Sequence, residues 1–138
     1  MDYHPQLSAG EVEQLIRKGM PAAANLQVLA VEPGRARCRI PVTDAMRRPG
    51  GTVSGPLMFT AADAAMYAVI LAHVGPKLLA VTTDASIHFL RKPELVDIIA
   101  DARLLKLGKR LVVCHVEVFS DGRDLPVATA TGSYSLPD

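Results

Sequence analysis

Asp63 is the only formally charged side chain between Pro49 and Pro76, a stretch otherwise made of apolar and small residues. A carboxylate buried among apolar side chains without partners either has a raised pKa or destabilises the fold, by on the order of several kcal/mol. Proteins often tolerate that cost where the group does chemistry, which makes Asp63 a candidate general base or nucleophile. The alternative is structural, in which Asp63 caps a neighbouring backbone N–H group or pairs with a buried histidine.

A second candidate element is Ser54-Gly55-Pro56, where the apolar stretch is expected to become helical. The start of a helix presents unsatisfied N–H groups and a partial positive charge, which suit an anion or a developing oxyanion. Pro56 has no N–H, so the N–H of Gly55 remains as an accessible donor; a plain N-cap is the alternative interpretation. Gly55 and Asp63 lie about 12 Å apart along a helix axis, too far for both to act on one atom within a single rigid subunit.

The apolar stretch predicts one long helix from about Gly55 to His73, with Pro56 at its first helical position and Gly75-Pro76 as its stop. A helix that is apolar on all faces must be buried on all sides or lie in a membrane. Its length is close to a membrane span, but an Asp near the middle costs roughly 2.5–3.5 kcal/mol on insertion. We therefore expect burial inside a curved sheet and no membrane insertion.

Two-residue periodicity predicts strands on both sides of this helix. Leu26–Val31 and Arg35–Val42 flank Pro33-Gly34, a pair suited to the centre of a type II turn, and are expected to form a hairpin. Four further strands are expected at Leu78–Leu90, Leu95–Leu105, Arg110–Phe119 and Leu125–Leu136. The three short connections between these four runs imply antiparallel pairing, and hence an α+β fold.

Composition favours one ordinary globular domain over residues 1–138, opened by a short helix at about 8–19 with Ser8 and Glu11 as its capping box. The formal net charge is +1 and the aromatic share is 4% without tryptophan, which argues against a nucleic-acid surface. The amino terminus has neither a basic region nor an apolar run, so we expect no secretory signal and a cytoplasmic location. Cys38 and Cys114 lie in separate strand-like stretches and are expected to be buried free thiols.

Three runs, taken together in their order and spacing, resemble a known family: GPLMFTAADAAM at 55–66, AVTTDASIHFLRKP at 80–93 and ARLLKLGKR at 102–110. They are similar to the hotdog-fold acyl-CoA thioesterases of the PaaI type, which are related to the 4-hydroxybenzoyl-CoA thioesterases. The likeness extends over roughly residues 20–136. It implies a curved antiparallel sheet wrapped around one long central helix.

The resemblance also implies roles for particular residues. Asp63 would act on a thioester as nucleophile or general base, and the N–H of Gly55 would polarise the thioester carbonyl. Family members assemble the site across a dimer interface, so the two groups would come from different subunits of a homodimer or of a dimer of dimers. Thr82 or Thr83 would orient the water or the acid. No metal or redox cofactor is implied, because coenzyme A is part of the substrate, and its phosphates would meet basic residues: Arg48, Arg91, Lys92, Lys106, Lys109 and Arg110.

One departure from the family pattern concerns the helix start. Members commonly have His-Gly-Gly there, with an Asn or Gln some residues earlier, whereas this chain has Ser54-Gly55-Pro56 and Arg48. The first hypothesis is hydrolysis of an acyl-CoA or aroyl-CoA to the acid and free coenzyme A. The second is a non-catalytic acyl-CoA binding protein, motivated by Ser54 in place of the histidine. A hydratase on the same fold is a weaker third, because no histidine stands near the helix start to pair with the acid.

Overall fold

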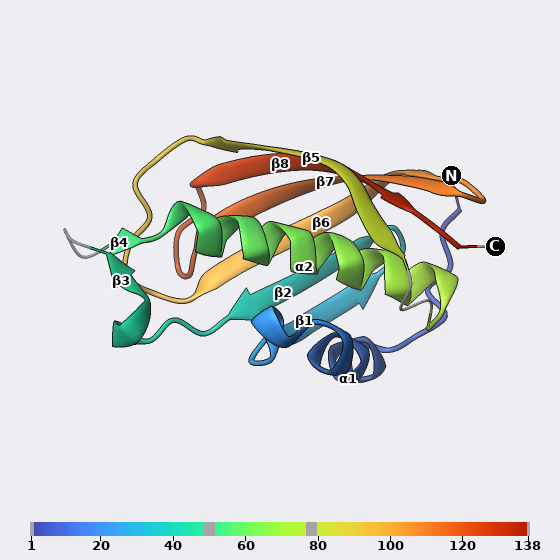
Figure 1. Ribbon diagram of the computed structural model, residues 1–138, viewed down its shortest axis with the longest axis horizontal. Coiled ribbons are helices and arrows are strands. Elements are labelled where there is room, and N and C mark those ends of the chain that lie inside the picture. Colours follow the sequence, from blue (N-terminus) through green and yellow to red (C-terminus); the bar gives the residue numbers. More distant parts are fainter. Residues whose placement is uncertain (1, 49–51, 77–79, 138) are drawn as a thin grey trace.

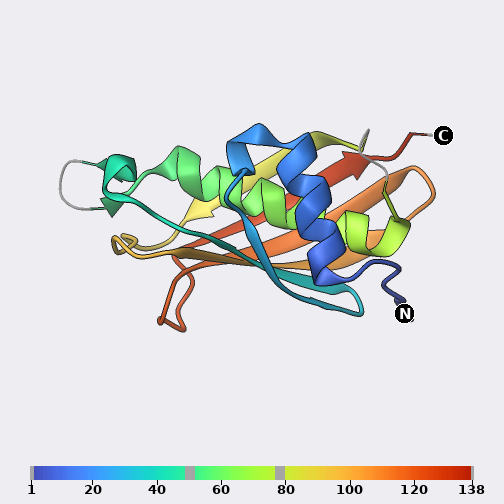
Figure 2. The ribbon, with the colours of Figure 1, turned by 90° about the horizontal axis from the view of Figure 1, so that it is seen from below.

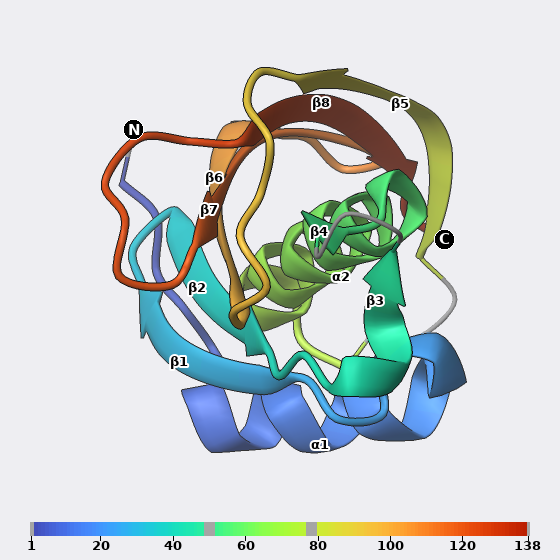
Figure 3. The ribbon, with the colours of Figure 1, turned by 90° about the vertical axis from the view of Figure 1, so that its left-hand side faces the viewer.

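A twenty-residue helix, α2 (Gly55–Val74), lies inside a curved antiparallel sheet that wraps around it (Figure 1, Figure 3). The computed structural model describes residues 2–48, 52–76 and 80–137, with the backbone alone for residues 22, 47, 48 and 52. The predicted α+β hotdog architecture is confirmed.

Helix α2 begins at the predicted Gly55, which makes Pro56 its second residue and not its first, and ends at Val74, one residue beyond the predicted His73. Ser54 has extended backbone angles, and its hydroxyl accepts a hydrogen bond from the Leu57 N–H at 3.2 Å, which makes it the N-cap. Gly75 ends the helix with a φ of 88°, a conformation that glycine adopts without penalty. The helix is long and apolar enough to cross a membrane, but 72% of its most apolar window is buried inside the protein. The curved sheet therefore supplies the apolar surroundings that such a helix requires.

Six strands form the sheet, and every neighbouring pair is antiparallel. In spatial order they are β1 (Gln27–Glu32), β2 (Arg35–Ile40), β6 (Ile98–Leu107), β7 (Leu111–Ser120), β8 (Ala128–Ser135) and β5 (Val81–Phe89). The hairpin predicted around Pro33-Gly34 is present as β1–β2. Two of the three short connections among the later strands form the expected hairpins, β6–β7 and β7–β8.

Strand β5 departs from that argument, because it pairs with β8 and not with β6. The N–H groups of Leu90 and Arg91 both bond to the carbonyl of Val127, just before β8, at 2.8 and 3.2 Å. The end of β5 is thus held beside β8, and the following segment crosses to β6 as a longer connection instead of a tight turn. Strand β5 consequently lies at one edge of the sheet and β1 at the other.

Smaller elements complete the fold. Helix α1 (Ala9–Gly19) has the predicted capping box of Ser8 and Glu11 and packs against β1 and α2 (Figure 2). Two short 3₁₀ helices, η1 (Pro21–Ala23) and η2 (Asp44–Met46), follow α1 and β2. Strands β3 (Arg47–Arg48) and β4 (Thr52–Val53) form a separate two-stranded antiparallel pair that the periodicity did not predict.

The interior between helix and sheet is aliphatic and rich in alanine, as the composition predicts. Backbones approach closely there: a Cβ atom placed on Gly132 of β8 would lie 2.7 Å from Sδ of Met66 on α2. Cys38 and Cys114 are buried free thiols, and burial raises the pKa of each thiol to about 12.

Candidate functional site

Asp63 lies near the middle of α2, half-buried, with its carboxylate turned toward strands β5 and β8. Its Oδ1 atom accepts two hydrogen bonds, one from the Thr82 hydroxyl at 2.9 Å and one from the Tyr134 hydroxyl at 2.5 Å. The Tyr134 hydroxyl also lies 3.1 Å from the backbone carbonyl oxygen of Asp63. Among the described residues, neither a backbone N–H group nor a histidine bonds to this carboxylate, so the structural alternatives for Asp63 are not realised there.

Tyr134 is the contact of Asp63 that the sequence analysis missed. It is on β8 with 3% of its surface exposed, and its ring stacks on Tyr67 of α2 at a centroid distance of 6.1 Å. Burial first, and then the negative charge of Asp63, raise the pKa of Tyr134 above its usual value. Tyr134 therefore stays protonated at neutral pH and acts as a hydrogen-bond donor to the carboxylate.

The two threonines of β5 have different positions. Thr82 bonds to Asp63, whereas the Thr83 hydroxyl donates to the backbone carbonyl of Ser133 at 3.3 Å. A register shift in the β5–β8 pairing between Thr82 and Asp84 causes this difference, because it leaves Thr83 unpaired and reverses the face on which Thr82 lies. Thr82 is thus the threonine that reaches the acid.

A pocket of about 250 Å³ opens in front of the carboxylate. Its lining is formed by Gly19, Met20, Asp63, Tyr67, Ala80, Val81, Thr82 and Tyr134. Among these residues the titratable side chains are Asp63, Tyr67 and Tyr134, and burial raises the pKa of Tyr67 as well. The negative charge of Asp63 is therefore stabilised there by neutral hydroxyl donors and not by a lysine or arginine of the described lining.

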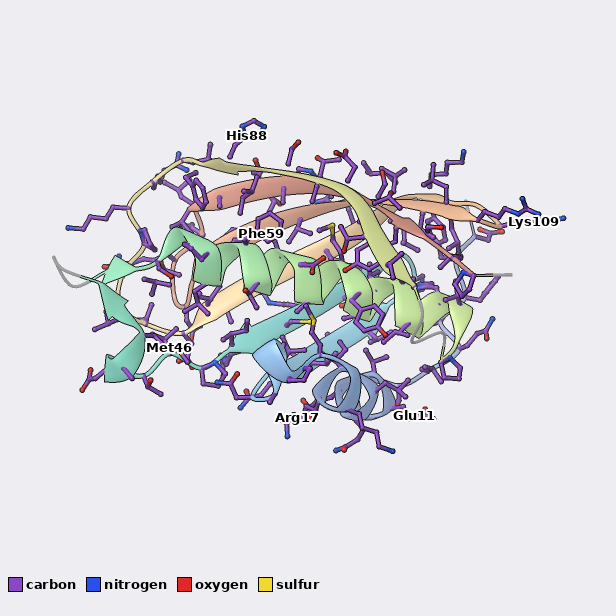
Figure 4. The ribbon with its side chains drawn as sticks, viewed as in Figure 1. Glu11, Arg17, Met46, Phe59, His88 and Lys109 are labelled. Carbon is purple, nitrogen blue, oxygen red and sulfur yellow. The ribbon has the colours of Figure 1, made fainter. Side chains whose placement is uncertain are left out.

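Gly55 begins α2 with its N–H group available. The Leu57 N–H bonds to the Ser54 hydroxyl, the Met58 N–H bonds to the Ser54 carbonyl at 3.2 Å, and Pro56 has no N–H. Within the described part of the chain, no acceptor is bonded to the Gly55 N–H. Gly55 lines a second, apolar groove of about 510 Å³, together with Pro56, Phe59, Ile87 and Phe89 (Figure 4 labels Phe59).

The two pockets share no lining residue. Asp63 lines one pocket and Gly55 lines the other. The two residues lie about two helical turns apart on α2. One chain therefore does not bring the two predicted catalytic groups together.

The predicted basic residues fall into two groups at opposite ends of the sheet. Arg91, whose guanidinium donates to the Pro126 carbonyl at 2.6 Å, and the exposed Lys92 line a surface pocket beside the β7–β8 connection. Lys106, Lys109 and Arg110 are exposed around the β6–β7 turn at the other end (Figure 4 labels Lys109). Arg48 belongs to β3, and its side chain lies outside the described part of the structure.

An antiparallel sheet curved around one long helix, with a carboxylate and a free helix-start N–H on that helix, defines a protein of the hotdog class. The model of the thioesterase superfamily matches residues 50–127, which is more than half of the chain. The chain belongs to the thioesterase superfamily. The resemblance to this family inferred from the three sequence runs is thereby confirmed.

Individual relatives agree with this assignment. A crystal structure from Silicibacter sp. TM1040, named "putative thioesterase", is 40% identical, covers 99% of this chain and 96% of its own, and superposes with a TM-score of 0.91. The phenylacetic acid degradation protein PaaI of Thermus thermophilus, in a mutant structure, is 28% identical with a TM-score of 0.71, over 86% of this chain and 97% of its own. A protein of Saccharolobus solfataricus named "putative esterase" is 29% identical over 94% of this chain and 86% of its own length.

Proposed function

We propose that the protein hydrolyses the thioester of an acyl-CoA or aroyl-CoA, with Asp63 as the acting carboxylate and the Gly55 N–H as the oxyanion donor. Membership of the thioesterase superfamily supports a hydrolase acting on a thioester or ester bond. The observation that carries the residue assignment is the half-buried Asp63 carboxylate, held by two hydroxyls in a pocket without a described cationic partner. Such a site suits proton transfer or nucleophilic attack.

Two chemical routes use the same atoms. As a general base, Asp63 takes a proton from water, the water oxygen bonds to the thioester carbon, and the carbon–sulfur bond breaks to release coenzyme A as a thiolate. As a nucleophile, a carboxylate oxygen of Asp63 bonds to that carbon and expels the same thiolate, and water then hydrolyses the resulting anhydride. In both routes negative charge develops on the carbonyl oxygen. The Gly55 N–H would donate to that oxygen, a contact worth about 10²–10³ in kcat in comparable sites.

We further propose a homodimer in which Asp63 of one subunit faces Gly55 of the partner subunit. The separate pockets of the two groups support this arrangement, since one chain alone leaves each group without the other. Strand β5 offers a surface for such pairing: it lies at the edge of the sheet and exposes apolar side chains, including Val81 at 57% and Phe89 at 54%. An open apolar strand edge is a template for pairing with another chain.

The surroundings of the two pockets suit the parts of an acyl-CoA. The groove beside Gly55 is lined by apolar residues, among them Phe59 and Phe89, and fits an acyl or aroyl group. The exposed basic groups at the two ends of the sheet suit phosphates. In a dimer paired through β5, antiparallel subunits would bring Arg91 and Lys92 of one subunit toward the β6–β7 turn of the other.

A second candidate function is binding of acyl-CoA without turnover. Ser54, which occupies the position of the family histidine, is engaged as the N-cap of α2, so its hydroxyl has a structural task. A panel of acyl-CoA and aroyl-CoA thioesters, assayed both for binding and for release of free thiol, separates the two functions. Tight binding without thiol release would favour the binding protein.

The first prediction tests Asp63 itself. Asp63→Asn keeps an oxygen that accepts from Thr82 and Tyr134, so the fold should be retained, but the amide can neither take a proton nor attack. We expect loss of detectable thiol release at an unchanged thermal unfolding midpoint. Asp84→Asn on the exposed face of β5 is the matched control and should keep the wild-type rate. Full turnover by Asp63→Asn would overturn the assignment.

A further inference from the structure

The hydrogen bonds of Asp63 are distributed unequally between its two oxygens. Thr82 and Tyr134 both donate to Oδ1. No described residue donates to Oδ2, although the same pocket contains a third hydroxyl-bearing residue, Tyr67. The carboxylate, on a residue that lines the pocket, therefore has one oxygen engaged by the protein and one without a described donor.

We propose that Tyr134 is a positioning residue: with Thr82 it anchors Oδ1 of Asp63, so that Oδ2 is the oxygen that takes the proton or attacks the thioester. This inference rests on the proposed function, in which Asp63 acts on the thioester. Beyond the proposed function, it assigns a role to Tyr134 on β8 and specifies Oδ2 as the atom of Asp63 that reacts.

The sheet holds the two hydroxyl donors, Thr82 and Tyr134, in fixed positions. Thr82 and Tyr134 are direct cross-strand partners in the β5–β8 pairing, so their hydroxyls approach the same oxygen from neighbouring strands. Tyr134 is held in turn by stacking on Tyr67, with 11° between the ring planes. A residue in a paired strand with a packed ring cannot follow the carboxylate if it rotates. The two bonds therefore oppose rotation of the Asp63 side chain and leave Oδ2 as the carboxylate oxygen without a described protein donor.

The electrostatics of the pocket support this role. Asp63, Tyr67 and Tyr134 are the titratable side chains among its described lining residues, so no described cation competes with the hydroxyls for the carboxylate. Tyr134 stays protonated because burial and the charge of Asp63 both oppose its ionisation. Its hydroxyl keeps its proton and donates to Oδ1 at 2.5 Å, with the backbone carbonyl of Asp63 as a longer alternative acceptor at 3.1 Å. Hydrogen bonds to a charged group are among the stronger ones in proteins.

The test uses Tyr134→Phe in the full-length protein. This change removes one hydroxyl and leaves the stacked ring in place, so the fold should persist. We expect kcat to fall about ten- to hundredfold, with KM within about twofold of wild type, because a hydrogen bond to a charged group is lost at the reacting acid and not at the substrate. Thr82→Val should act in the same direction. Thr83→Val is its matched control, since the Thr83 hydroxyl bonds to Ser133 and not to Asp63.

A purely structural role for Tyr134 would give a different pattern, in which the unfolding midpoint falls while kcat stays at the wild-type value. That pattern would overturn the proposal.

The contact between Tyr134 and Asp63 can be tested even if the protein does not hydrolyse thioesters. Should the wild-type protein hydrolyse none of the thioesters in the panel, the carboxyl carbon of Asp63 is followed by NMR in protein labelled with carbon-enriched aspartate. The chemical shift of this resonance is expected to differ between wild type and Tyr134→Phe, and to be unchanged in Thr83→Val. An Asp63 signal that is identical in wild type and Tyr134→Phe would show that the hydroxyl does not hold the carboxylate.

Discussion

A backbone N–H group survives most substitutions, so the role proposed for Gly55 can be tested only by changing the backbone itself. Proline is suited to this position, because it removes the N–H and is well tolerated at the first position of a helix. The residue before a proline must be extended, and Ser54 already is, with φ −75° and ψ 154°. Gly55→Pro can therefore remove the donor without breaking α2.

We expect Gly55→Pro to lower kcat by about 10²–10³-fold, the effect of removing one oxyanion donor. Gly55→Ala is the matched control, because it adds the same Cβ atom but keeps the N–H. That Cβ would lie 3.3 Å from the ring of Phe89, which is exposed and has room to shift. Equal losses of thiol release in the two variants would show that crowding against Phe89, and not the N–H, is responsible.

At the scale of single residues, the sequence pointed to the candidate acid, Asp63, but not to all the residues that contact it. Asp63 stands out because it is alone in an apolar stretch, and Gly55 because a proline follows it at a helix start. Their catalytic roles stay predictions until they are assayed. Tyr134 could not be found in this way, because its contact depends on the pairing of β8 with β5, which no local pattern encodes.

Strand pairing also decides whether Thr82 or Thr83 contacts Asp63, and the sequence did not predict which one does. Strict alternation along the strand puts Thr83 on the face of Ala85 and Ile87, which pack against the core. The register shift between Thr82 and Asp84 brings Thr82 toward Asp63 instead. A bulge of one residue has no distinctive sequence here, and yet it decides which hydroxyl reaches the acid.

At the scale of elements, periodicity predicted which segments are strands but not the complete strand order. The capping box of α1, the turn at Pro33-Gly34 and the limits of α2 depend on neighbouring residues, and all were predicted to within one residue. The position of β5 beside β8 depends on contacts between distant segments. The short β3–β4 pair was missed because strands of two residues carry no periodic signal.

Close packing of α2 against β8 gives a prediction about stability. Gly132→Ala would place a methyl group 2.7 Å from Sδ of Met66 and 3.1 Å from the Asp84 carbonyl oxygen. Met66 is buried and has little room to move, so we expect a loss of about 1–3 kcal/mol of unfolding free energy from overpacking. Chemical denaturation measures this change.

Gly10→Ala in α1 is the matched control, because no atom lies within 4 Å of the added methyl group. Alanine is favoured over glycine within a helix by roughly 0.5–1 kcal/mol, so this variant should be as stable as wild type or more so. A Gly132→Ala protein with wild-type stability would show that the helix moves away from the sheet without cost.

At the scale of the whole molecule, the proposed dimer can be tested by mixing defective subunits. Asp63→Asn and Gly55→Pro chains are co-expressed with different affinity tags, and the dimers that carry both tags are purified. If each site takes Asp63 from one subunit and Gly55 from the other, a mixed dimer has one doubly defective site and one intact site. We expect it to recover about half of the wild-type rate, since one of two symmetric sites is restored.

The same experiment contradicts the arrangement if both groups act within one subunit, because every site of the mixed dimer would then contain one defect and thiol release would stay at the level of the parents. Light scattering on the wild-type protein supplies the control. A monomer in solution would refute the dimer directly, whatever the mixed chains do.

The β5–β8 pairing also determines when during folding the site can form. Thr82 lies on a strand that follows α2 directly, whereas Tyr134 lies on the most C-terminal strand of the sheet, after the whole β6–β7 hairpin. Pairings between distant segments are slow to form, because the intervening chain must first be ordered. A nascent or partly folded chain with α2 and β5 but without β8 therefore holds Asp63 by one hydroxyl at most. Hydrolytic activity should appear only when β8 has entered the sheet, so that refolding followed by thiol release reports the last step of assembly.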